Sequence, residues 1–289
     1  MSDAEAILPV RLAHPWPFGL WPWALAPWPL GCTHSMDLMG LSRSPPTINP
    51  HMQTQTIVAA AAIIGVTLTE TQASQLVVYA DLLNEWNARF NLTAITEEQA
   101  VLALHFIDSL TLLRVLPARS GITLLDVGTG AGFPGLVLKI ARPDLFVTVI
   151  DSTAKKITFC QEVIRRLRLS GARALHVRSE EFAQRKIERD HYDVVVARAV
   201  AMLPTLVEYM LPFVSVGGLC IAMKGGSAEE EARTAVNAIG QLGGALRTVE
   251  SVELPGLPDK RALVLIDKVS RTQSRYPRPA GAPRNSPLQ

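Results

Sequence analysis

Four glycines stand close together after a short apolar run and an acidic residue. The stretch reads LLDVGTGAGFPG over residues 124–135, and its glycines are Gly128, Gly130, Gly132 and Gly135. Glycine adopts positive φ without a steric penalty and lets a ligand approach the backbone closely, but it costs conformational entropy on folding. Such a cluster therefore favours a nucleotide-binding loop over an ordinary tight turn.

Two cofactors compete for this loop. Residues 128–132 read G-x-G-x-G, as in many S-adenosylmethionine enzymes, whereas residues 130–135 read G-x-G-x-x-G, the dinucleotide fingerprint. In the first register Gly128 follows the strand-like run Leu124–Val127 at once, but in the second two residues intervene. The first register fits better, so we expect S-adenosyl-L-methionine. A nicotinamide-dependent oxidoreductase is the alternative.

Two acidic residues end successive strand-like runs. Asp126 lies where a carboxylate either holds the loop or meets a ligand ammonium group. Asp151 follows 25 residues later. A carboxylate there is able to accept hydrogen bonds from both ribose hydroxyls, which suits the adenosine of either cofactor.

An arginine and a histidine–aspartate pair complete the candidate chemistry. Arg198 follows the apolar run Val194–Ala197. A charge at the carboxyl end of a central strand belongs to a site or pairs with an acid, so we predict a functional role. His105 and Asp108 share one face of a predicted helix. They form a structural hydrogen-bonded pair or line the substrate cleft, and the sequence leaves both open.

Alternating strand-like and helical segments position these residues. The expected strands are Ile122–Val127, Phe146–Ile150, Ala174–Val177, Asp193–Ala197, Leu219–Met223, 246–254 and 262–268; helical patterns cover 134–141, 154–169, 203–213 and 227–240. This alternation of strands and helices predicts an α/β fold with a mostly parallel sheet that helices cover on both faces. The last two strands predict a closing antiparallel hairpin, which is typical of S-adenosylmethionine-dependent methyltransferases.

The chain divides into four parts by pattern. Residues 54–118 are helical, with capping boxes predicted at Thr69–Gln72 and Thr96–Gln99. Residues 119–268 form the α/β domain, and residues 269–289 form a basic tail. We expect that tail to be a disordered segment or a flexible arm for phosphates.

Residues 1–53 differ from the rest in composition. They are rich in proline and tryptophan, and no Asp, Glu, Lys or Arg occurs from Leu12 to Met36. Five prolines interrupt that apolar run, which argues against a membrane helix. We expect a disordered extension, or a start codon assigned too early, and no membrane association. The three cysteines lie far apart and no metal-ligand spacing occurs, so we expect thiols in a reducing compartment and no metal.

Several stretches together make the sequence resemble a known family. They read NLTAI (91–95), HFIDSL (105–110), DVGTGAGFPG (126–135), IDSTAKK (150–156), RSEEF (178–182), VARAV (196–200) and MKGG (223–226). They are similar to bacterial small-subunit rRNA guanine N7-methyltransferases of the RsmG/GidB family. Residues 275–288 resemble the C-terminus of many members, and the resemblance spans about residue 56 to the end.

The resemblance implies a Rossmann-like class I methyltransferase domain that uses S-adenosylmethionine. It implies that the acceptor is a guanine N7 in 16S rRNA, free or in an assembling small ribosomal subunit, and that the protein is a cytoplasmic monomer. It also implies a set of site residues. The cofactor-binding set is Gly128, Gly130, Phe133, Asp151, Ser179, Glu180 and Arg198, and Arg198 is the catalytic residue as well.

Chemistry that the sequence lacks agrees with this acceptor. No cysteine next to proline is present for attack on a cytosine carbon, and no N-P-P-[YF] motif is present for an exocyclic amine. Guanine N7 carries an in-plane lone pair and no proton, so its methylation needs alignment and no general base. A methyltransferase with another acceptor is the alternative within this chemistry.

Overall fold

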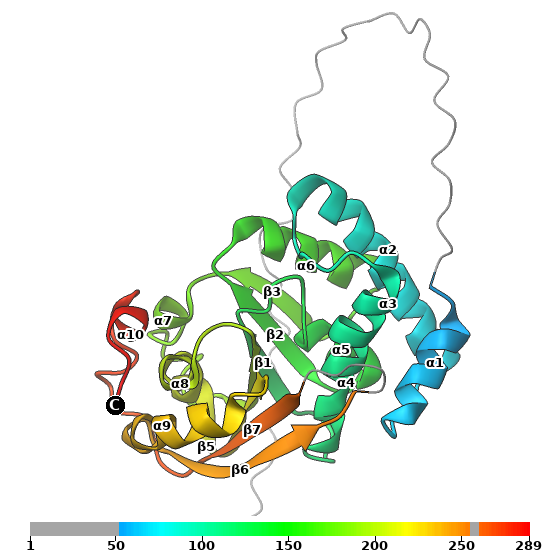
Figure 1. The fold of residues 1–289 in the computed structure, drawn as a ribbon. Helices are drawn as coiled ribbons and strands as arrows, with labels where there is room; N and C mark the ends of the chain where they lie inside the picture. The colour runs from blue at the N-terminus through cyan, green and yellow to red at the C-terminus, as the bar shows by residue number, and fades with distance from the viewer. Residues whose placement is uncertain (1–51, 255–259) are drawn as a thin grey trace, which may run out of the picture. The chain divides into compact units, whose positions relative to one another are not determined.

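The structure is a computed structural model that describes residues 52–254 and 260–289 (Figure 1). The predicted N-terminal extension therefore lies outside the described residues, except for its last two. Within the described part, no helix combines the length and the apolar character needed to cross a membrane.

A seven-stranded sheet forms the centre of the described chain, in the order β3-β2-β1-β4-β5-β7-β6. The strands are β1 (Thr123–Val127), β2 (Phe146–Asp151), β3 (Ala172–His176), β4 (Tyr192–Arg198), β5 (Val214–Lys224), β6 (Gly244–Val252) and β7 (Arg261–Lys268). Neighbours from β3 to β5 are parallel, and β7 is antiparallel to both β5 and β6. The predicted mostly parallel sheet and closing hairpin are confirmed.

Helices cover both faces of the sheet (Figure 1). On one face pack α1 (Thr54–Ile63), α2 (Glu70–Phe90), α5 (Gly135–Ala141) and α6 (Ala154–Arg166); on the other pack α7 (Ser179–Phe182), α8 (Leu203–Met210) and α9 (Ala228–Gln241). Successive residues of one strand serve opposite faces. Leu124 belongs to the first core and Leu125 to the second, as the two-residue period of a strand requires.

The helical lead-in continues through α3 (Glu98–Val101), the π-helix η1 (Leu102–Ile107), α4 (Asp108–Leu110) and the 3-10 turn η2 (Thr111–Arg114). The capping box at Thr69 is confirmed, with both reciprocal hydrogen bonds to Gln72. The one predicted at Thr96 is wrong. Glu97 caps α3 instead, because its carboxylate accepts hydrogen bonds from two backbone amides, those of Gln99 and Ala100.

The basic C-terminal segment is folded, which corrects the expectation of a disordered or flexible tail. It packs beside α8 and includes the short helix α10 (Ala282–Asn285). The 3-10 turn η3 (Leu211–Phe213) directly follows α8. The cause is a buried acid. Glu208 of α8 is inaccessible to solvent, and the Arg278 guanidinium pairs with its carboxylate at 2.7 Å. Composition alone does not show that a core carboxylate needs a tail arginine.

Candidate active site

Two cavities open at the carboxyl ends of the parallel strands, where α/β sheets bind ligands. The loop cavity has a volume of about 800 Å³ and is lined by the glycine loop, the ends of β2 and β3, α8 and the C-terminal segment. The arginine pocket has a volume of about 410 Å³ and lies around Arg198. The segment 198–202, which begins with the last residue of β4, separates them, since Arg198 and Ala199 line the pocket while Val200, Ala201 and Met202 line the cavity.

The four glycines divide into two pairs. Gly128 lines the loop cavity, where an added Cβ would come within 2.6 Å of the Val200 side chain, and a Cβ added to Gly130 would point into open space, with both residues at positive φ. A Cβ on Gly132 would collide with the Tyr79 hydroxyl, and one on Gly135 would come within 2.9 Å of Asp126. Gly132 and Gly135 therefore serve internal packing. Gly128, which belongs only to the G-x-G-x-G register, thus lines the cavity, whereas two of the three glycines of the dinucleotide register, Gly132 and Gly135, are used in internal packing.

The two acidic residues have different tasks. Asp126 is fully buried and accepts hydrogen bonds from the Thr129 hydroxyl at 2.6 Å and the Gly135 amide at 2.8 Å, and burial raises its pKa to about 6. It holds the loop. Asp151 lines the cavity and accepts from the Gly130 amide at 3.0 Å and the Thr153 amide at 2.8 Å. Its carboxylate thus fixes the loop backbone at the edge of the cavity.

Ser179 and Glu180 open α7 and also line the loop cavity. The Ser179 hydroxyl donates to the Tyr209 carbonyl at 2.6 Å, and Glu180 accepts from the Gly281 amide at 3.1 Å. Glu180 is 7% exposed. A buried carboxylate on the wall of an open cavity is available to a polar ligand.

Phe133 is placed in the interior, away from the wall of the loop cavity. Its ring stacks on His105 with centroids 4.4 Å apart and on Tyr79 at 5.3 Å. The Arg198 guanidinium lies over the same ring, with its carbon 5.3 Å from the centroid. The Tyr79 hydroxyl donates to the Ala131 carbonyl of the glycine loop. This stack connects the loop to the arginine pocket.

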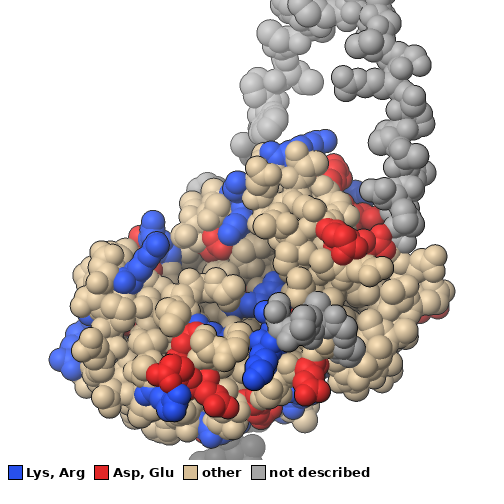
Figure 2. Space-filling view, in the orientation of Figure 1, with Lys and Arg blue, Asp and Glu red and all other residues tan. Residues whose placement is uncertain are grey.

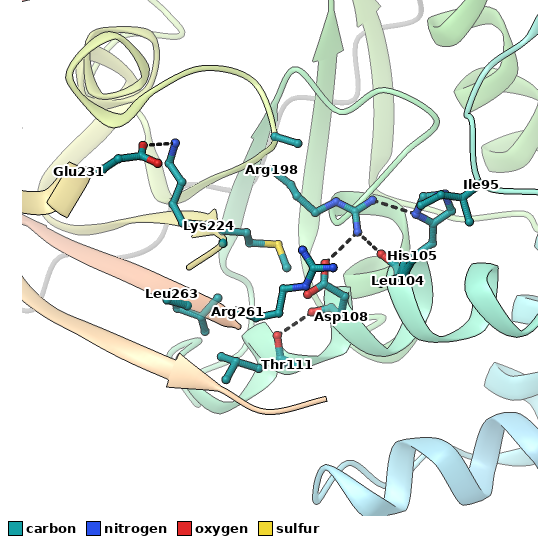
Figure 3. Close-up of a pocket in the computed structure, with 15 residues that line it drawn as sticks. Ile95, Leu104, His105, Asp108, Thr111, Arg198, Lys224, Glu231, Arg261 and Leu263 are labelled. Carbon is teal, nitrogen blue, oxygen red and sulfur yellow. Dashed lines mark hydrogen bonds and ion pairs between the residues drawn. The ribbon is translucent and has the colours of Figure 1, made fainter. Parts of the chain in front are cut away.

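Arg198 is held by one helical segment (Figure 3). It donates to the Leu104 carbonyl at 2.6 Å, to Asp108 at 3.0 Å and to Nδ1 of His105 at 3.3 Å. The segment 102–107 is a π-helix, whose wider turn rearranges the backbone hydrogen bonds and is frequent at functional sites. His105 and Asp108 both face Arg198 and line the pocket, which favours the cleft interpretation.

The hydrogen bonds fix the state of His105. Because arginine only donates, Nδ1 must accept, so Nε2 carries the proton and donates to the Thr93 hydroxyl at 3.1 Å. Burial, followed by the charge of Arg198, lowers the pKa of His105 to about 4. Burial also raises the pKa of Asp108, against the effect of Arg198. The imidazole is therefore neutral at physiological pH and has no nitrogen free to act as a base.

Sequence reasoning missed several residues of the pocket. Thr93 supports His105 and is itself clamped by Asn87, whose amide bonds the Thr93 backbone at both ends. Lys224 pairs with Glu231 at 2.6 Å, and Arg261 of β7 points into the pocket near Asp108 (Figure 3). The motif around Thr93 was visible in the sequence. Arg261 carried no local signal, because only the sheet order brings β7 beside β5.

Basic side chains gather in and around the hollow of the face shown in Figure 2. Arg198, Lys224 and Arg261 line the arginine pocket. A groove of about 990 Å³ shares Arg261 with it and adds Arg114 and Lys260. The groove also contains acidic side chains, so its charge is mixed. Arg198 and Lys224 are each paired with an acid, Asp108 and Glu231, so part of the positive charge is compensated within the pocket.

The family model and the relatives of this chain agree on one family. The model of rRNA small subunit methyltransferase G matches residues 72–263. A Ribosomal RNA small subunit methyltransferase G from Desulforamulus reducens is 46% identical, covering 81% of this chain and 98% of the relative. One from Pelotomaculum thermopropionicum is 47% identical with the same coverages. Among solved structures, M. jannaschii TYW2 in complex with AdoMet is similar with a TM-score of 0.47 and 13% identity, covering 61% of this chain and 80% of that one.

Proposed function

Since the chain belongs to the rRNA small subunit methyltransferase G family, we propose that it transfers a methyl group from S-adenosylmethionine to N7 of a guanine in 16S rRNA. One observation of the structure carries this proposal. The loop cavity and the arginine pocket lie on either side of residues 198–202, so a donor in one and a guanine in the other would meet at the end of β4.

The residues of the loop cavity fit the methyl donor. S-adenosylmethionine supplies a methyl group that the sulfonium already activates. Gly128, on the cavity wall beside Val200, would let the methionine end approach the loop backbone, and the Asp151 carboxylate on the same wall would accept hydrogen bonds from the ribose hydroxyls. Ser179 and Glu180 would read the adenine edge. Phe133 would support the glycine loop from its interior side without touching the donor, because its ring is buried in a stack with Tyr79 and His105.

The residues of the arginine pocket suit an acceptor that needs no base. Both nitrogens of His105 are engaged, and Asp108 is paired with Arg198. Arg198 would position the guanine or its phosphate, and the fixed network would keep it aligned. Positive charge develops on the guanine during transfer. The Asp108 carboxylate neutralises the charge of Arg198, so the ion pair as a whole would not disfavour the positive charge that develops on the guanine.

We propose that rRNA phosphates meet the basic residues Arg114, Lys260 and Arg261 of the groove. Their contacts would make rRNA affinity fall as salt rises. The substrate is 16S rRNA or an assembling small subunit, and the protein acts as a cytoplasmic monomer without a membrane partner. Membership of the family supports the rRNA substrate. The cytoplasmic location is proposed because small ribosomal subunits assemble there.

A methyl-transfer assay tests the proposal. The full chain is incubated with S-adenosylmethionine and unmethylated small-subunit particles or protein-free 16S rRNA, and nucleosides are identified by mass. Formation of 7-methylguanosine in rRNA is the expected result. Methylation of a protein or small molecule, with the rRNA unmodified, would contradict the proposed rRNA acceptor and still support S-adenosylmethionine as the donor.

A further inference from the structure

The C-terminal segment 281–287 forms part of the wall of the loop cavity. Gly281, Arg284, Asn285 and Pro287 line it together with Asp151 and Glu180. These tail residues are separated from the glycine loop by about half the chain, so no local motif connects them. Covering the sheet would not by itself require these tail residues to line the cavity, so their position needs a separate explanation.

The segment is anchored firmly before it reaches the cavity. Arg278 bonds the buried Glu208 through its backbone amide at 2.8 Å and its guanidinium. Arg189 donates to three tail carbonyls, those of Thr272, Gln273 and Tyr276. These contacts lie outside the cavity wall. The anchor is therefore separate from the residues that a ligand would touch.

Beyond the anchor, the backbone reaches a residue of the cavity. The Gly281 amide donates to Oε1 of Glu180 at 3.1 Å, and Pro283 is buried with its carbonyl accepting from the Thr205 hydroxyl at 3.2 Å. One oxygen of Glu180 is thus held by the tail. The other oxygen is available to a donor in the cavity, and the bond fixes the plane of the carboxylate.

We propose that residues 281–287 are part of the methyl-donor site. The Gly281 amide orients Glu180, and Arg284 and Asn285 cover the adenosine end of the ligand. A planar guanidinium stacks well on an aromatic base, so Arg284 is a contact residue and Gly281 a positioning residue. This inference rests on the proposed use of S-adenosylmethionine. It assigns the tail to donor affinity and not to rRNA.

Calorimetric titration of the full chain with S-adenosylmethionine tests the assignment. The double variant Arg284→Ala, Asn285→Ala changes exposed side chains, so its melting temperature should be unchanged. Loss of these contacts should raise the Kd for the donor about fivefold or more. Arg275→Ala is the matched control, because Arg275 lies in the same tail, over Tyr276, and does not line the cavity. Its Kd should equal that of the unmodified chain.

Hydrogen exchange gives a second readout without any substitution. Binding of the donor should slow exchange of the amides of 281–287 in the full chain and leave those of β6 unchanged. Donor binding with unchanged exchange in 281–287, or a double variant with an unchanged Kd, would overturn the inference. A double variant weakened only toward rRNA would overturn it as well and make the tail an RNA contact. If the unmodified chain bound no donor, the proposed function would fail first.

Discussion

The loop cavity and the arginine pocket are built in different ways. The loop cavity is centred on two neighbouring strand ends, Val127–Gly128 of the glycine stretch and Ile150–Ser152 of the next strand, and α7, α8 and the tail add the remaining walls. The arginine pocket joins the π-helix η1, Arg198 and Arg261, which lie far apart in the sequence. A ligand-binding loop is thus encoded locally, whereas the pocket depends on packing between the helical lead-in and the sheet.

The largest effect should come from the residue at the boundary of the two cavities. Arg198→Ala should lower the methylation rate about 10³-fold, as expected for removal of a fixed charged group from an active site. Binding of S-adenosylmethionine should change little, because Arg198 lines the arginine pocket and not the loop cavity; a large rise in the Kd would instead support the cofactor-binding role that the family resemblance implies. Rates and donor Kd are measured together, with circular dichroism as the folding control. Unchanged turnover would remove Arg198 from the site.

Stability should respond to pH in opposite directions in the two regions. The folded pKa of Asp126 is raised to about 6, so its protonated form favours folding and this contribution is lost as pH rises from about 4 to 6. The folded pKa of His105 is lowered to about 4, so its contribution is present above pH 6.5 and is lost as pH falls toward 4.

Two variants separate these contributions in thermal melts between pH 4 and 6.5. In Asp126→Asn, the loss of folding stability that the unmodified chain shows as pH rises should be absent. In His105→Asn, the loss of folding stability that the unmodified chain shows as pH falls should be absent. Each is on the order of 1–3 kcal/mol. The amide oxygen of either variant still accepts a hydrogen bond, which preserves the local contact. Identical pH profiles for both variants would contradict the opposite assignments.

A smaller effect should come from the support of His105. Thr93→Val keeps the shape but removes the hydroxyl that accepts from Nε2 of His105. The same hydroxyl accepts from the Ile95 amide at 3.1 Å, and loss of both bonds should slow methyl transfer about fivefold. Thr158→Val is the matched control, because the Thr158 hydroxyl bonds only within α6, at Ala154. Equal rates for both variants would show that the histidine needs no support.

The difference between the regions explains what could be predicted from the sequence. The strands, the hairpin and the glycine register follow from period and spacing, and each strand is found within a few residues of its expected place, although β5 begins earlier, at Val214. The folded tail could not be predicted, because the Arg278–Glu208 pair joins residues 70 positions apart. The interior place of Phe133 likewise depends on Tyr79 and His105.

The central claim is that the glycine loop holds a methyl donor in the 128–132 register. Calorimetric titration of the full chain with S-adenosylmethionine, and separately with NAD, tests it most directly. We expect saturable binding of S-adenosylmethionine, weakened about 10²-fold in Asp151→Ala by the loss of charged hydrogen bonds, and no binding of NAD. Binding of NAD without binding of S-adenosylmethionine would contradict the claim and restore the 130–135 register.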